Sequence, residues 1–321
     1  MTEPVLVADI GGTNARFAIA ELGDGAIRLH HPQIFRAEDF DTVRDATDAY
    51  YESVSVDVSR ACFAAAGPIK DGAVNFTNSQ WVLRTKDISD PLGLKQLRIV
   101  NDFYALASSI NYLELESYRT IKAGTGNPRA PQLIIGPGTG FGQALIVPTD
   151  GGCKVVATEG GHTTFAPQGN LEFEIMKFIE KEHTRVCVER LLSGRGFINL
   201  HRALCAIEGA PYVFMQAHEI TKSAAEGADV MAVKTVDLFL TILGRVAGDA
   251  VLATGAQGGV VLGGGILPKM IDEFPFTSFV KSFGDKDRIS SYLDDVPIRL
   301  ILADGAALYG AAALLDEGRV G

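Results

Sequence analysis

The chain has 321 residues, of which 47% are hydrophobic and 21% are charged, and its formal net charge is −10. At roughly 150 residues per domain, this length suggests two domains with a sizeable core, and the composition excludes a disordered or fibrous protein. The acidic balance argues against a nucleic-acid partner, because proteins that bind the phosphate backbone need clustered lysine and arginine.

The first expected element is a strand–turn–strand hairpin. Residues 5–10 form an apolar run, a Gly-Gly-Thr-Asn sequence follows at 11–14, and Phe17 and Ile19 then share one face at the two-residue period of a strand. Asp9 interrupts the apolar run, and a buried aspartate is costly unless a cation or hydrogen-bond donors lie beside it. Because the amides of a glycine turn can hold phosphates, this pattern predicts a phosphate site linked to Mg²⁺.

The remainder of the first half alternates strands and helices. Residues 61–66 and 97–100 predict buried strands, and residues 103–113 predict a helix. Asn101 and Asp102 lie between the second strand and that helix, at the carboxyl end of a strand, where open α/β sheets bind their ligands. The alternative is that Asp102 only caps the helix, which is a common task for aspartate.

A second hairpin of the same kind is expected about half a chain later. Residues 133–135 are apolar, residues 136–142 are rich in glycine, and residues 143–148 again favour a strand. Both hairpins contain a Gly-Thr pair, which we interpret as a duplicated domain whose two hairpins face a shared cleft. Two unrelated surface hairpins are the alternative.

Neither glycine cluster matches a familiar phosphate loop. The Gly-x4-Gly-Lys-Ser/Thr run of a Walker loop does not occur, and the Gly-x-Gly-x-x-Gly fingerprint fails because Phe141 and Gln143 occupy positions that require glycine. Each cluster also joins two strands instead of opening a helix. The sequence therefore excludes both the P-loop and the dinucleotide fingerprint.

Three further segments of the second half carry polar or glycine-rich patterns. Glu159 and His162 flank two glycines, and Glu189 stands among apolar residues; a tight turn and a Glu–Arg surface pair are the alternatives. The glycines at 263–265 connect an expected strand, 260–262, to an expected helix. They suit the close approach of a flat ring or an α-phosphate, with a plain turn as the alternative.

The other elements of the second half complete the pattern. Helices are expected over residues 171–182 and 235–252, and a strand over residues 298–302. Residues 305–315 are rich in alanine and glycine, which permits close helix packing. Alternating elements of this kind predict an α/β fold with largely parallel central strands.

The sequence offers no signal for export, membrane insertion or zinc binding. Its N-terminus lacks a basic region followed by an apolar run, and its apolar runs are too short for a bilayer. Cys62, Cys153, Cys187 and Cys205 form no Cys-x-x-Cys pair. We expect a cytoplasmic protein with reduced cysteines, no structural zinc and no membrane partner.

Taken in order, these segments resemble the bacterial glucokinases. The resemblance extends from about residue 5 to about residue 315 and rests on residues 9–16, 77–81, 101–103, 136–142, 159–162, 189–194 and 263–265. It implies the two-lobed actin/hexokinase-like (ribonuclease H-like) α/β fold, a duplicated mixed sheet flanked by helices. It also implies a small domain of residues 1–112 plus 303–321, a large domain of residues 113–302, and an active site in the cleft between them.

The resemblance further implies ATP-dependent phosphorylation of D-glucose to glucose 6-phosphate, with ATP and Mg²⁺ bound and Asp102 as the base that activates the 6-hydroxyl. Asp9 would contact Mg²⁺ through water, and the protein would form a homodimer. The implied sugar-binding residues are Asn78, Asn101, Asp102, Glu159, His162 and Glu189. The implied ATP-binding residues are Ala8, Asp9, Ile10, Gly11, Gly12, Thr13, Asn14, Gly138, Thr139, Gly140, Gly263, Gly264 and Gly265.

Other functions stay open beside this one. A broader hexose or hexosamine kinase is the nearest alternative. A sugar-sensing transcription regulator on the same fold would normally need an additional DNA-binding segment, whereas this sequence starts directly with the first strand. An actin-like or chaperone-like ATPase is disfavoured by the implied sugar-binding set of Glu159, His162 and Glu189.

Overall fold

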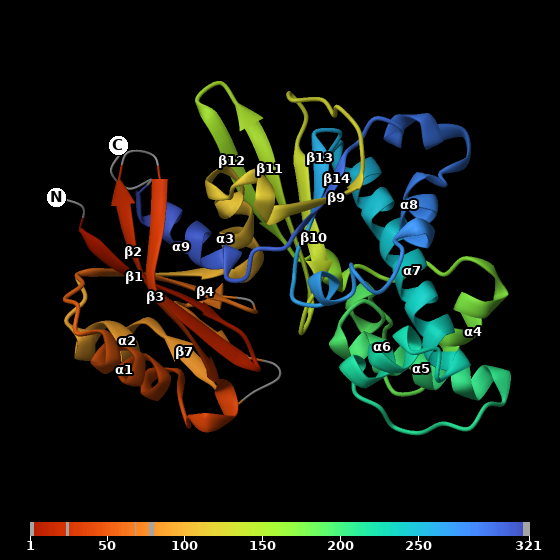
Figure 1. Ribbon diagram of the computed structural model, residues 1–321, viewed down its shortest axis with the longest axis horizontal. Helices are drawn as coiled ribbons and strands as arrows, with labels where there is room; N and C mark the ends of the chain where they lie inside the picture. Colours follow the sequence, from red (N-terminus) through yellow and green to blue (C-terminus); the bar gives the residue numbers. More distant parts are fainter. Residues whose placement is uncertain (1–2, 24–25, 68, 77–79, 317–321) are drawn as a thin grey trace. The chain divides into compact units, whose positions relative to one another are not determined.

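The computed structural model describes residues 3–23, 26–67, 69–76 and 80–316. The chain forms two compact units, whose elements are labelled in Figure 1. The first unit contains Met1–Tyr118, Val155–Ala157 and Leu302–Gly321, and the second contains Arg119–Lys154 and Thr158–Ile301.

The main sheet of the first unit has five strands in the order β3-β2-β1-β4-β8. Strands β1, β4 and β8 run parallel to one another, with β8 at one edge of the sheet. Strand β2 pairs antiparallel with both β1 and β3. A small second sheet has the order β5-β6-β7. The strands are β1 (Pro4–Ile10), β2 (Asn14–Gly23), β3 (Ala26–Arg36), β4 (Arg60–Ala65), β5 (Ile69–Lys70), β6 (Ala73–Asn75), β7 (Val82–Arg84) and β8 (Gln96–Asn101). Because parallel strands end at the same edge of a sheet, the segments that follow β1 and β8 leave from one edge.

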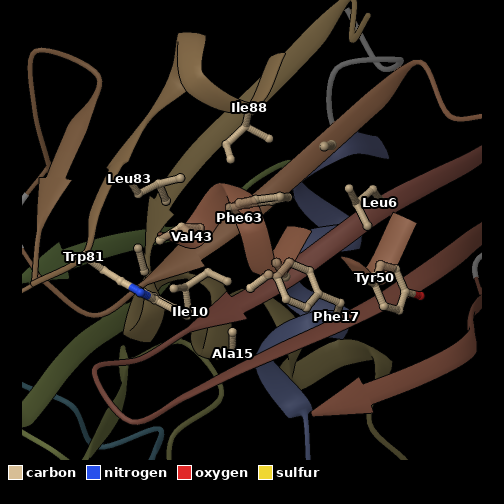
Figure 2. Close-up of a cluster of buried hydrophobic side chains, with 14 of the residues drawn as sticks. Leu6, Ile10, Ala15, Phe17, Val43, Tyr50, Phe63, Trp81, Leu83 and Ile88 are labelled. Carbon is tan, nitrogen blue, oxygen red and sulfur yellow. The ribbon is translucent and has the colours of Figure 1, made fainter. Parts of the chain in front are cut away.

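One face of this sheet carries a large apolar cluster. Ile10 of β1, Phe17 of β2 and Phe63 of β4 pack with Tyr50 of the helix α1 (Val43–Val54), and all four side chains are buried (Figure 2). Burying a large apolar side chain contributes about 1.5–3 kcal/mol. The cluster therefore holds β1, and with it the start of the turn that follows, in a defined position.

The opposite face is covered by α3 and α9, which come from distant parts of the sequence (Figure 1). A Cβ on Gly310 of α9 would run into the carbonyl oxygen of Ala105 in α3, so the glycine lets the two helices approach closely. This confirms the close packing expected for residues 305–315. The helices of the first unit are α1 (Val43–Val54), α2 (Thr85–Leu92), α3 (Asp102–Ser109) and α9 (Ala306–Asp316).

The six-stranded sheet, in the order β12-β11-β10-β13-β14-β9, belongs to the second unit except for Tyr118 of β9 and Val155–Ala157 of β12. β10 pairs antiparallel with β11 and parallel with β13, which is itself parallel to β14. The strands are β9 (Tyr118–Lys122), β10 (Gln132–Pro137), β11 (Phe141–Thr149), β12 (Gly152–Thr158), β13 (Gly259–Leu262) and β14 (Ile298–Ile301). Apart from β9, this order repeats that of the first sheet, with β10–β11 in the place of β1–β2.

Helices pack around α7 in the second unit. α7 contacts α5, α6 and α8, and Phe197 of α5 stacks on Phe239 of α7 with ring centroids 3.9 Å apart. Arg245 of α7 forms a buried ion pair with Glu172 of α4. Within the described ranges, no helix combines the length and apolar character needed to cross a bilayer. The helices are α4 (Gly169–Glu180), α5 (Gly194–Glu208), α6 (Ala217–Ala225), α7 (Val230–Thr254) and α8 (Thr277–Gly284).

The structure confirms both predicted hairpins and the predicted parallel strands, and it corrects two helices. The helix expected over residues 103–113 ends at Ser109 and continues as one 3₁₀ turn, Ile110–Tyr112. The helix expected after residues 263–265 is only a 3₁₀ turn, Leu267–Lys269. Pro268 lies in the first turn, where proline is tolerated, but Pro275 disfavours helical geometry in the residue before it and so limits any helix that starts here. The expectation of a helix start at this glycine segment was therefore wrong.

Candidate active site

Asp102 lies where β8 ends and α3 begins. The N-cap of α3 is Asn101, whose Oδ1 accepts hydrogen bonds from the N–H groups of Phe103 (2.9 Å) and Tyr104 (3.1 Å). Asp102 is the first helical residue, and its Oδ1 also accepts from the N–H of Phe103, at 2.9 Å. The cap is thus supplied by the neighbouring amide, so the alternative in which Asp102 serves only as the N-cap does not describe this helix.

The turn between β1 and β2 is closed by its own backbone. The N–H of Gly11 donates to the carbonyl of Asn14 at 2.9 Å. The side chains of Ala8 and Ile10 are buried in the core, so a nucleotide can meet these two residues only through backbone atoms. The tip of the turn, residues 12–13, is the part that can present amide groups to phosphates.

Asp9 projects from β1 beside a guanidinium group. Arg16 is its cross-strand partner on β2, with Nη1 3.8 Å from Oδ2 of Asp9, and Nη2 of the same guanidinium lies 3.4 Å from Oδ1 of Asp304. Burial raises the pKa of Asp9 above its ordinary value; Arg16 opposes this shift and Asp304 adds to it. A carboxyl group in such a position is stabilised in its ionised form when a further cation approaches.

The turn of the second hairpin is fastened to neighbouring backbone. The N–H of Gly138 donates to the carbonyl of Gly140 at 2.8 Å, and the carbonyl of Gly138 accepts from the N–H of Gly194 at 3.0 Å. Gly264 has a φ of 85°, and a Cβ there would run into the carbonyl oxygen of Pro137. The second hairpin and the glycine segment 263–265 therefore lie against each other, as two parts of one predicted nucleotide site.

Glu159 and His162 are placed on the same hairpin by two glycines. A Cβ on Gly160 would run into the side chain of Gln143, and a Cβ on Gly161 into the carbonyl oxygen of Phe141, so this segment packs directly on β11. Nε2 of His162 is 3.9 Å from Oε2 of Glu159, and both side chains are exposed. They form a polar pair that can both donate to and accept from hydroxyl groups.

Glu189 joins this group through strand-like pairing. The N–H of Val188 donates to the carbonyl of Thr163 at 3.0 Å, and Thr164 forms an isolated bridge with Cys187. Oε2 of Glu189 accepts from the N–H of Phe141 at 2.8 Å. The second unit thus collects three of the predicted sugar residues around the start of β11.

The predicted set is therefore divided between the two units. The first unit holds Asn101, Asp102 and residues 8–14, and the second holds Glu159, His162, Glu189 and the two other glycine segments. Asn78 lies outside the described residues.

Sequence reasoning missed Arg16 and Asp304, which flank Asp9. The first could have been found, because a tight turn over residues 11–13 places residue 16 opposite residue 9. Nothing local to Asp304 points to this role, because the residue follows β14, far along the chain.

Comparison with known proteins decides the family. The family model described as glucokinase matches residues 6–318. The chain belongs to the glucokinase family. It is 37% identical over 316 residues to the glucokinase of Hahella chejuensis, with 98% of each chain covered. It is 40% identical over 319 residues to the glucokinase of Caulobacter vibrioides, which covers 98% of this chain and 96% of the relative. This member of the glucokinase family is an enzyme, a glucose kinase.

Solved structures agree with the glucokinase fold. A glucokinase from an Antarctic psychrotroph gives a TM-score of 0.84 at 37% identity, covering 99% of this chain and 100% of the other. A ROK family glucokinase from Streptomyces griseus, solved in complex with glucose and AMPPNP, gives a TM-score of 0.67 at 22% identity and covers 99% of this chain and 100% of the other. The latter likeness concerns the fold alone. The predicted fold class, a duplicated mixed sheet flanked by helices, is confirmed.

Proposed function

We propose that this enzyme transfers the γ-phosphoryl group of ATP to the 6-hydroxyl of D-glucose, with Asp102 as the base. The hydroxyl proton passes to the Asp102 carboxylate, and the sugar oxygen forms the new bond to phosphorus. The bond between that phosphorus and the bridging oxygen breaks, and its electron pair leaves with ADP. The observation that carries this proposal is that Asn101, and not Asp102, is the N-cap of α3. Asp102 is the next residue after the end of β8, and we assign its carboxylate to proton transfer.

The remaining polar residues position the sugar. Glu159 and Glu189 accept hydrogen bonds from hydroxyl groups, the amide of Asn101 donates through the nitrogen that the cap does not use, and His162 can do either. Each polar partner left unpaired by a wrong sugar costs about 1–3 kcal/mol, which gives such a site its specificity. Asn78 stays in the proposed set on the strength of the family resemblance alone.

The phosphates are held by backbone amides rather than by basic side chains. We assign the turns at residues 12–13 and 138–140 to the phosphates and residues 263–265 to the adenosine. The packing of Gly264 on Pro137 supports one continuous surface for the latter two. Amide groups add no net charge, so an acidic protein can bind an anionic nucleotide in this way.

Asp9 is the proposed anchor for Mg²⁺, through water. No three His, Cys, Asp or Glu side chains gather as a metal cage in the part of the chain that the structure describes. A nucleotide-bound Mg²⁺ needs fewer protein ligands, since it is typically held by one or two carboxylates, phosphate oxygens and water. Asp9 fits this requirement, because its side chain is 22% exposed and its distance of 3.8 Å from Arg16 is longer than a hydrogen bond, so its oxygens can accept from a metal-bound water. When bound, the ion neutralises charge on the β- and γ-phosphates.

The cellular compartment and the oligomeric state of the enzyme are the last parts of the proposal. All four cysteines are free thiols, which suits the reducing cytoplasm. Val213 and Phe214 are 69% and 61% exposed, and neighbouring exposed apolar side chains suit contact with a second copy in a homodimer. Light scattering of the purified protein gives its mass in solution and tests the dimer.

A sugar panel assayed with MgATP tests the proposed reaction. We expect glucose to give the highest kcat/KM among glucose, mannose and glucosamine, with glucose 6-phosphate as the product. Equal kcat/KM values for all three sugars would make the enzyme a broader hexose kinase. ATP turnover that no sugar stimulates would overturn the proposal.

A further inference from the structure

Glu189 connects two parts of the site that the proposed function treats separately. The half-buried residue lies in the 3₁₀ turn Val188–Arg190, and its Oε2 accepts a hydrogen bond from the backbone N–H of Phe141 at 2.8 Å. Phe141 begins β11 directly after the glycine turn that we assign to the phosphates. A residue of the proposed sugar set therefore holds the backbone of the proposed phosphate turn.

The turn contains two glycines, Gly138 and Gly140, and only Gly140 lies against the carboxylate of Glu189. A Cβ on Gly140 would run into Oε2 of Glu189, whereas a Cβ on Gly138 would meet no atom within 4 Å. Neither glycine has a φ in the left-handed region, so the two positions differ in space and not in backbone conformation. The absence of a side chain at position 140 is what allows Glu189 to reach Phe141.

Backbone contacts hold both partners in place. The hydroxyl of Ser193 donates to the carbonyl of Glu189 at 2.8 Å, and the N–H of Gly194 donates to the carbonyl of Gly138 at 3.0 Å. The segment that carries Glu189 is thus tied to the glycine turn at two points, the side chain of Glu189 and the N–H of Gly194. A displacement of the turn is passed to the carboxylate, and a displacement of the carboxylate is passed to the turn.

We propose that Glu189 is shared between the two substrates: Oε2 positions the phosphate turn through Phe141, while Oε1 binds a sugar hydroxyl. Glucose and nucleotide then bind cooperatively through the second unit. This inference rests on the proposed function, because it assumes that glucose and ATP are the substrates. Thermodynamic linkage makes the effect reciprocal, so the factor by which glucose tightens nucleotide binding equals the factor by which nucleotide tightens glucose binding.

Equilibrium binding without turnover tests the proposal. Calorimetry on the full chain gives the glucose Kd alone and with saturating Mg²⁺ and a non-hydrolysable ATP analogue. In the absence of nucleotide, Gly140→Ala should weaken glucose binding about tenfold, because it breaks a charge-assisted hydrogen bond that positions the carboxylate. Gly151→Ala, a matched change in the turn between β11 and β12 where a Cβ would also meet no atom within 4 Å, should alter that Kd by less than about twofold.

The coupling factor supplies a second, independent readout. In the wild-type protein the ATP analogue should lower the glucose Kd, and in Glu189→Met, which offers no oxygen to the N–H of Phe141, this effect should be largely lost. Glu189→Met keeps roughly the size of the side chain and removes the acceptor, so it decides the matter if thermal melting shows that Gly140→Ala does not fold.

Two results would overturn the inference and leave the proposed function standing. One is an equal glucose Kd for the two alanine variants when both are folded. The other is a Glu189→Met variant that binds glucose more weakly but keeps the full coupling factor, because the carboxylate would then serve the sugar alone. A wild-type protein that binds no glucose would overturn the inference and the proposed function together.

Discussion

The two units share a strand order but surround their glycine hairpins with different neighbours. Beside the β1–β2 turn, Asp9 faces the guanidinium of Arg16, which also faces Asp304. The β10–β11 turn is instead fastened to the backbone of Gly194 and to the carboxylate of Glu189. The same hairpin can thus serve two tasks, because the task depends on the side chains that lie beyond the turn.

This contrast suggests that the two units contribute different kinds of side chain to the reaction. The first unit contributes carboxyl groups suited to proton transfer and to a metal ion, Asp102 and Asp9. The second contributes the polar groups suited to holding a sugar, Glu159, His162 and Glu189. If the division is correct, substitutions in the first unit lower turnover, and substitutions in the second unit lower affinity.

The largest effect is expected for Asp102→Ala. Loss of the base should lower kcat by about 10²–10⁴-fold, with the thermal melting curve little changed. Asp45→Ala is a matched control, since Asp45 also lies in the first turn of a helix of the first unit, where it accepts from the N–H of Thr42 at 3.0 Å. The control should lose about 1 kcal/mol of stability and keep its kcat. A near-normal kcat for Asp102→Ala would show that Asp102 is not the base and has only a structural role.

A stability comparison between the two hairpins comes next. Gly136→Ala should cost about 1–3 kcal/mol of unfolding free energy by overpacking, because the new Cβ runs into the carbonyl oxygen of Gly263. Gly11→Ala should cost much less, because its Cβ would meet only the carbonyl oxygen of Asn14, at 3.4 Å. Urea unfolding of both variants measures the difference. Equal losses would mean that the two turns are packed alike.

Glu159→Gln tests the affinity side of the division. The glucose KM should rise about tenfold while kcat and the KM for ATP change little, because the substitution weakens an acceptor for a sugar hydroxyl. Steady-state kinetics with each substrate varied in turn measure all three constants. An unchanged glucose KM would remove Glu159 from the sugar site.

The smallest effect concerns His201, a buried residue of α5 in the second unit. Burial lowers the pKa of His201, opposed by Asp229, whose Oδ2 is 3.9 Å from Nε2. The unfolded chain therefore binds a proton more readily than the folded chain below the ordinary pKa of 6.5. The contribution of His201 to stability should be constant above that pH and should fall below it, by at most about 1.4 kcal/mol per pH unit. In His201→Gln this part of the slope of Tm between pH 7.5 and 5 should disappear; an unchanged slope would exclude His201 as its source.

Local patterns predicted much of the fold and little of the contact network. The hairpins were predictable because apolar runs of period two flank clusters of glycine, and both features act within a few residues. The N-cap of α3 was harder to predict, because Asn101 and Asp102 are adjacent and both can cap a helix. The 3₁₀ turn at Leu267–Lys269 was missed because Pro268 fits the first turn of an α-helix as well as that of a 3₁₀ turn.

The sequence by itself determined the two hairpins, the parallel strands beside them and the family to which the chain belongs. Only the tertiary structure decided which groups meet. Phe141 and Glu189 are 48 positions apart, and the bond between them forms because β11 and the turn at residues 188–190 pack together in the second unit. Arg16 lies near Asp304 in the same way, through the packing of the first unit rather than through any spacing along the chain. Hydrogen bonds and ion pairs depend on distances in space, and only the packed chain sets those distances.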